Sequence, residues 1–163
     1  MDPATRERLA LALTAPGRPL DVREAAAVEL AGAGDRRAFE TLALLLNHQD
    51  EARARQAAKA LLRLGDPRTG RAAAVLATNP LRTGYALPAI RLLVDLRAPE
   101  AVPALTETLQ RLRARPRPAL DHIARACAEG LETLRTAGAD TGGGDGGRPD
   151  AERPPPAGGL TAG

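Results

Sequence analysis

A helix, a short break and a second helix recur along this chain about every 31 residues. Residues 50–76 show the unit in full, because Gly65 can end one helix in the left-handed conformation and Asp66 can cap the next. Pro67 then suits the first turn of the new helix. The same cap position recurs at Asp35, 31 residues before Asp66. One such hairpin cannot bury its apolar face alone, so the repeat predicts an α-solenoid of stacked hairpins.

Apolar residues at helical spacing predict an all-α structure throughout the repeats. Trp is absent and the chain has one Phe and one Tyr, so the core must consist of Leu, Ala and Val, which suits packed helices better than a β-sandwich. In the second helix, Asp21 and Glu24 have the spacing of a capping box. The expected helices, about four hairpins in all, cover residues 3–14, 21–33, 35–46, 50–64, 67–77, 85–96, 99–113 and 119–136.

Composition divides the chain at Gly138. Residues 1–137 carry the helical pattern and are expected to form one repeat domain. Residues 138–163 are dominated by Gly and Pro and cannot bury an apolar face, so we expect a disordered tail. The glycine-rich run at 142–147 follows no strand and precedes no Lys-Ser or Lys-Thr pair. It is therefore not a phosphate-binding loop.

Three segments of the chain resemble HEAT repeats. They are VREAAAVELAGAGD at residues 22–35, ARQAAKALLRLGDPR at 54–68 and APEAVPAL at 98–105, and they are similar to the short bacterial HEAT-like class that also occurs in phycobilin lyases. The resemblance implies an armadillo-like α-α superhelix in which the second helices of the hairpins line a concave, partner-binding side. The third unit departs from the pattern, since Arg97 stands in place of Gly65.

Partner-binding residues are expected on the second helix of each hairpin. When these helices are aligned at about 100° per residue, three positions in each point away from the core. Leu44 and Val75 would be either apolar residues surrounded by charge, as in a contact patch, or incidental surface residues. An acidic partner segment would fit the arginines, so charge reversal at Arg68 and Arg71 is expected to weaken its capture without lowering the melting temperature. The candidate residues are Arg37, Glu40, Leu44, Arg68, Arg71, Val75, Glu100 and Glu107, with Pro103 at the ninth position.

The chemically reactive residues do not form the nucleophile, base and orienting group of an enzyme, and we expect no catalysis, cofactor or metal. His122 and Cys127 lie five positions apart, on different faces of one helix, with Cys127 in the core. His48 is expected in a surface turn with no second histidine near it. The capping aspartates recur once per unit with Arg23 and Arg55, which predicts structural ion pairs between stacked turns.

Charge leaves nucleic-acid binding as a second hypothesis. The net charge is +3 and the pI about 9.9, but the basic residues, all Arg except Lys59, alternate with acids as on solvated helix faces. HEAT-like DNA glycosylases, which the chain distantly resembles in architecture, need aromatic residues that face the nucleic acid. Here Phe39 falls in a core stripe and only Tyr85 remains, so nucleic acid is not the expected partner. A lyase-related subunit is a third hypothesis, implied by the resemblance alone.

The leading hypothesis is a non-catalytic HEAT-like scaffold that binds an unidentified protein partner, with its oligomeric state left open. A single cysteine excludes an internal disulfide. The sequence shows no signal-peptide pattern and no uninterrupted apolar run of about 18 residues. We therefore expect a cytoplasmic protein with no membrane partner.

Overall fold

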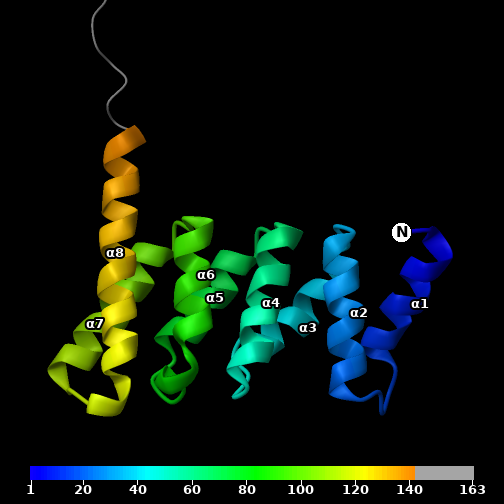
Figure 1. The fold of residues 1–163 in the computed structure, drawn as a ribbon, viewed down its shortest axis with the longest axis horizontal. Coiled ribbons are helices and arrows are strands. Elements are labelled where there is room, and N and C mark those ends of the chain that lie inside the picture. Colours follow the sequence, from blue (N-terminus) through cyan, green and yellow to red (C-terminus); the bar gives the residue numbers. More distant parts are fainter. Residues whose placement is uncertain (142–163) are drawn as a thin grey trace, which may run out of the picture.

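The computed structural model describes residues 1–141, which form eight α-helices and three short 3-10 helices and contain no strand (Figure 1). The predicted all-α class is confirmed. The predicted disordered tail falls mostly on residues 142–163, which lie outside the described part of the chain. The elements are α1 (Pro3–Thr14), α2 (Leu20–Gly32), η1 (Arg36–Ala38), α3 (Phe39–Leu45), α4 (Glu51–Leu64), α5 (Thr69–Thr78), η2 (Thr83–Tyr85), α6 (Leu87–Leu96), α7 (Ala101–Ala114), η3 (Pro118–Leu120) and α8 (Asp121–Thr141).

The helices stand in two rows, as Figure 1 shows. Helices α2, α4, α6 and α8 stand side by side in one row, and α3, α5 and α7 form a second row behind them. Helix α1 closes one end by packing on α2. Each helix packs on its neighbours in the same row and on helices of the opposite row. This is the stack of helix pairs that the repeat predicted.

The core fills the space between the rows with leucine and alanine, as the composition indicated. Small residues allow the helices to approach closely. Gly130 in α8 is the clearest case, because a Cβ there would lie 2.7 Å from Leu105 of α7 and 2.8 Å from Val94 of α6. The largest fully buried apolar side chains are Leu30, Leu42, Leu46, Leu61, Ile90, Leu92, Leu93, Leu105 and Ile123.

The predicted signals are confirmed in part, since Gly65 ends α4 and Asp35 caps η1, whereas α5 begins at Thr69 with no side-chain cap. The carboxylates of Asp35, Asp50 and Asp66 each accept a hydrogen bond from the backbone N–H two residues later, at 3.1, 2.9 and 3.0 Å. Gly34 and Gly65 adopt φ values of 71° and 63°, which L-residues rarely adopt. Local chemistry therefore fixes where the helices of the first two hairpins end and begin.

Two predicted details are wrong. Helix α2 begins at Leu20 with no side-chain cap, and Glu24 is instead buried, where it accepts a hydrogen bond from Arg53 Nη1 of α4 at 2.9 Å. The capping box fails because this ion pair between neighbouring hairpins uses the Glu24 carboxylate. Helix α8 continues past Gly138 to Thr141, so residues 138–141 are helical rather than part of a tail. Alanines beside Gly138 offset its low helix propensity.

Arg97 is the one non-glycine residue with a positive φ in the described chain. It ends α6 at φ 48° and ψ 42°, the position that Gly65 occupies in the preceding hairpin. A side chain in this conformation costs about 1 kcal/mol, whereas glycine is unstrained but loses more entropy on folding. Arg97→Gly is therefore expected to raise the free energy of unfolding by about 0.5–1 kcal/mol.

Urea unfolding of the purified chain would measure this change. Gly65→Ala is the matched control, because it introduces a Cβ at the same position of the preceding hairpin and is expected to cost about 1 kcal/mol. A loss of stability in Arg97→Gly would show that the arginine side chain contributes more than its backbone strain costs.

Candidate interaction surface

An open groove of about 480 Å³ lies between α3 and α5 in the second row of helices. Leu44 and Val75 line it, and their side chains are 81% and 63% exposed. Other large apolar residues such as Leu11, Leu81 and Val102 are exposed as well, but Leu44 and Val75 are exposed together in one groove, which marks a surface suited to contact. The lining residues are Phe39, Glu40, Ala43, Leu44, Arg68, Arg71, Ala72, Val75 and Leu76.

Five of the eight predicted partner-binding residues meet in this groove. They are Glu40, Leu44, Arg68, Arg71 and Val75. They lie together because positions that point away from the core in aligned helices become neighbours when the helices stack side by side; their role in binding a partner stays a prediction.

The other three predicted residues lie outside the groove. Arg37 bridges to the first helix, and its Nη1 donates to the carboxylate of Glu7 at 2.9 Å. Glu100 is half-buried against Gly70. A Cβ added to Gly70 would lie 2.7 Å from Oε2 of Glu100. Glu107 occupies on α7 the position of Leu44 and Val75, so the apolar surface ends at α5 and is not continuous along the row.

Arg68 is fixed by three contacts before any partner arrives. Its Nε and Nη2 donate to Asp66 at 3.0 and 2.9 Å, and its Nη1 donates to Glu40 of α3 at 3.1 Å. The guanidinium carbon lies 4.0 Å from the centre of the Phe39 ring, in cation–π contact. The Asp66 side chain is 1% exposed. Hydrogen bonds from Arg68 stabilise the carboxylate and hold the pKa of Asp66 below its ordinary value.

The same arrangement occurs one hairpin earlier, in the turn before α3. Arg37 Nη2 lies 2.7 Å from Asp35 of its own cap, while Nη1 reaches Glu7 of α1. Arg37 therefore links Asp35 to Glu7 of α1, and Arg68 links Asp66 to Glu40 of α3. Ion pairs between stacked turns were predicted correctly in kind, but the arginines are Arg37 and Arg68. Arg55 instead lies 4.0 Å from Glu51 within its own helix.

Arg71 is the free cation of the groove. Arg71 occupies on α5 the position that Glu40 has on α3. At the start of α7, Glu100 occupies the position that Arg68 has before α5, so the two charges are reversed relative to the Arg68–Glu40 pair. The Arg71 side chain is exposed and makes no hydrogen bond or ion pair with the part of the chain that the structure describes. It is available to an acidic group of a partner.

The structure shows where the residues considered for catalysis lie. Cys127 is fully buried in α8, and burial raises the pKa of its thiol to about 11, which keeps it protonated at neutral pH. Nδ1 of His48 accepts the backbone N–H of Asp50 at 2.9 Å, as in a turn. The expectation that no second histidine lies near His48 is wrong, because His122 lines the same pocket of about 160 Å³. The two residues are far apart in sequence, and the packing of α4 on α6 and of α6 on α8 brings them together.

Arg68 and Arg71 are expected to respond differently to charge reversal, which changes the expectation drawn from the sequence. Arg68→Glu deprives the buried Asp66 carboxylate of its partner and places a second acid beside it, so the melting temperature should fall by several degrees. Arg71→Glu breaks no contact and should leave it unchanged. Thermal unfolding by circular dichroism compares the two variants, and equal melting temperatures would show that the Asp66–Arg68 pair contributes nothing to stability.

Asp66→Asn tests the buried carboxylate through pH. Because the folded-state pKa of Asp66 lies below its unfolded value, ionised Asp66 stabilises the fold above about pH 4, and this contribution is lost as pH falls through the folded-state pKa. Asn keeps the capping acceptor but not the charge. The variant should therefore be less stable than the wild type at neutral pH, and the difference should shrink toward about pH 3. A constant difference in urea unfolding at both pH values would contradict this assignment.

No helix within residues 1–141 is long and apolar enough to span a membrane. The same residues contain no group of three or more His, Cys, Asp or Glu side chains positioned to hold a metal ion. No protein-family model, no curated protein and no solved structure matches this chain. The groove between α3 and α5 is therefore interpreted from its own shape and charge.

Proposed function

We propose that the protein is a non-catalytic, HEAT-like helical scaffold that binds a segment of another protein in the groove between α3 and α5. The proposal is based on the convergence of Leu44 and Val75, both exposed and apolar, with the unpaired Arg71 in one open groove. Exposed apolar side chains bordered by charge are the composition of a contact surface, in which a few anchors supply most of the affinity.

The groove favours a short amphipathic segment as its occupant. Helix α5 spans 10 residues, or about 15 Å, which matches two to three turns of a partner helix. Such a helix would place apolar side chains against Leu44 and Val75, in the manner of other helices that bind in apolar grooves. Acidic residues beside those anchors would meet Arg71 and the exposed part of Arg68. The partner segment is therefore expected to be apolar on one face and acidic at its edges.

Preorganisation supports this mode of binding. Asp66, Glu40 and Phe39 hold Arg68 in place, so its side chain loses little entropy when a partner docks. Arg71 is exposed and unpaired, and such peripheral charges contribute more to the rate of association and to specificity than to affinity.

The alternatives have less support from the residues that the structure describes. A nucleic-acid surface would offer aromatic rings for stacking, but Phe39 is buried under Arg68 and Tyr85 lies outside the groove, in contact with Arg82. Glu40 in the groove would also repel phosphates. For a lyase-related role, no described pocket brings together groups that point to a chromophore.

Selection of a displayed peptide library against the full chain tests the proposal. Enriched peptides are expected to share two apolar residues at helical spacing with acidic neighbours. Leu44→Asp combined with Val75→Asp should weaken their binding at least about tenfold, since it places charge against the apolar anchors. Arg71→Glu should slow association and reduce the dependence of binding on salt. The control is Leu81→Asp, because Leu81 is 91% exposed and lies outside the groove.

Three results would contradict the proposal. Peptides that bind the Leu44→Asp/Val75→Asp variant as tightly as the wild type would place the binding surface elsewhere. Enriched sequences without acidic residues would remove the role of Arg71. Concentration-dependent dimerisation that these substitutions abolish, measured by sedimentation, would identify a second copy of the chain as the occupant.

A further inference from the structure

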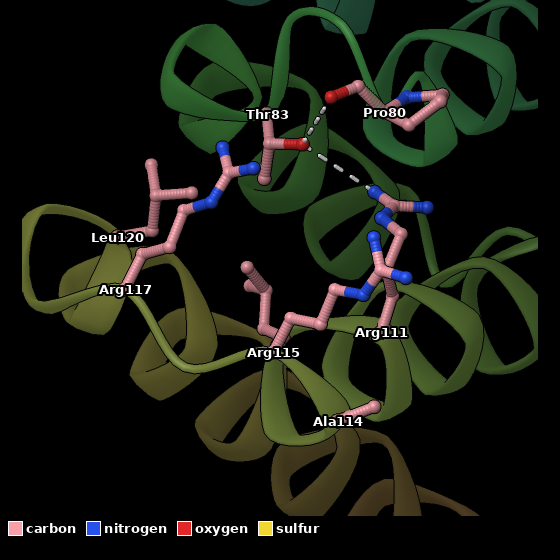
Figure 2. Close-up of a pocket in the computed structure, with 8 residues that line it drawn as sticks. Pro80, Thr83, Arg111, Ala114, Arg115, Arg117 and Leu120 are labelled. Atoms are coloured by element: carbon pink, nitrogen blue, oxygen red, sulfur yellow. Dashed lines mark hydrogen bonds between the residues drawn. The ribbon is translucent and has the colours of Figure 1, made fainter.

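A separate pocket of about 380 Å³ lies in the last hairpin, and it shares no residue with the groove between α3 and α5. One side is formed by the turn that leads into η2, and the other by the end of α7 and its connection to α8 (Figure 2). The lining residues are Pro80, Thr83, Arg111, Leu112, Ala114, Arg115, Arg117 and Leu120.

Three arginines line this pocket and no acidic residue does. Arg111 is anchored, since its Nη1 donates to the Thr78 carbonyl at 3.0 Å and its Nη2 lies 3.5 Å from Thr83 Oγ1. The guanidinium groups of Arg115 and Arg117 make no hydrogen bond or ion pair within residues 1–141. Figure 2 shows Arg115 pointing toward Arg111, and Arg117 pointing toward Thr83 across the opening. Because Nη1 of Arg111 also lies 4.0 Å from Glu107, the charges that the described residues leave unpaired are those of Arg115 and Arg117.

Two prolines restrain the backbone at the two free arginines. In the sequence Arg-Pro-Arg-Pro each arginine precedes a proline, which excludes the helical conformation at that residue. Arg115 accordingly has φ −135° and ψ 81°, and Arg117 has φ −134° and ψ 114°. This extended connection restrains the backbone of both arginines beside the pocket, which both side chains line.

Helix capping accounts for only part of the cluster. Arg111 and Arg113 lie in the last turn of α7, where cations offset the partial negative charge of the carboxyl end. The backbone N–H of Arg115 donates to the Arg111 carbonyl at 3.2 Å and so closes α7. The guanidinium groups of Arg115 and Arg117 donate to no carbonyl of the helix, so capping does not explain the charge of these two side chains.

We propose that this pocket binds a small organic phosphate. Guanidinium groups bind phosphate oxygens through paired, charge-assisted hydrogen bonds, and Arg115 and Arg117 would supply them from two sides. Pro80, Leu112 and Leu120 offer apolar walls for an organic group. The volume falls in the range of small-molecule sites and exceeds the need of inorganic phosphate alone. The ligand class is therefore a phosphate monoester with an apolar or aromatic body.

Calorimetric titration of the full chain with phenyl phosphate tests this assignment, with inorganic phosphate and phenol as the two halves of the ligand. Phenyl phosphate should bind saturably and more tightly than either half. Arg115→Ala combined with Arg117→Ala should weaken its binding at least about tenfold, because charge-assisted hydrogen bonds to the phosphate are lost. Both arginines are exposed, so the melting temperature of this variant should not change.

The matched control is Arg113→Ala combined with Arg125→Ala, which removes the same charge from exposed positions outside the pocket. Equal weakening in the control would indicate attraction by net charge and would overturn the proposal, as would the absence of saturable binding. A short DNA duplex provides the third arm, at fixed ionic strength. If the duplex binds through Arg115 and Arg117 and phenyl phosphate does not displace it, the surface recognises nucleic-acid backbone rather than a small molecule.

Discussion

The fold depends on burial of apolar helix faces that no single hairpin can complete. Leucine and alanine side chains between the two rows lose their contact with water only when the next hairpin is in place, and each buried leucine contributes about 2 kcal/mol. The alanines and Gly130 matter as much as the leucines, since they set how closely the helices approach. An open stack of this kind leaves whole helix faces uncovered, which makes surfaces such as the groove between α3 and α5 available.

Polar links between neighbouring helices add direction to this non-directional packing. In the first two hairpins an arginine joins the aspartate of its own turn to a glutamate two helices earlier in the chain. Arg37 joins Asp35 to Glu7 of α1, and Arg68 joins Asp66 to Glu40 of α3. The third hairpin breaks the series, because Glu100 replaces the arginine and Arg97 replaces the glycine stop. Glu100 packs against Gly70 and makes no ion pair with Arg71, so Arg71 lies unpaired beside the apolar residues of the groove.

The two proposed binding surfaces share a physical principle, although they lie in different parts of the stack. In each, one arginine is held by the protein before a ligand arrives, Arg68 by Asp66 and Phe39 and Arg111 by the Thr78 carbonyl, and unpaired arginines lie beside it. The surfaces differ in shape. The groove between α3 and α5 is open and suits a segment of protein, whereas the pocket at the end of α7 suits a small anion.

The sequence by itself determined the helices, the glycine stop at Gly65, and five residues that meet in the groove, because these follow from glycine conformation and helical periodicity. Contacts between residues far apart in the chain could not be predicted in the same way. The tertiary structure alone decided that Glu24 pairs with Arg53 rather than capping α2, that Arg68 stacks on Phe39, and that His48 and His122 share a pocket. It also decided that Arg111, Arg115 and Arg117 surround one cavity. The reason is physical, since the repeat specifies how each helix begins and ends, whereas the packing of whole helices determines which distant side chains meet.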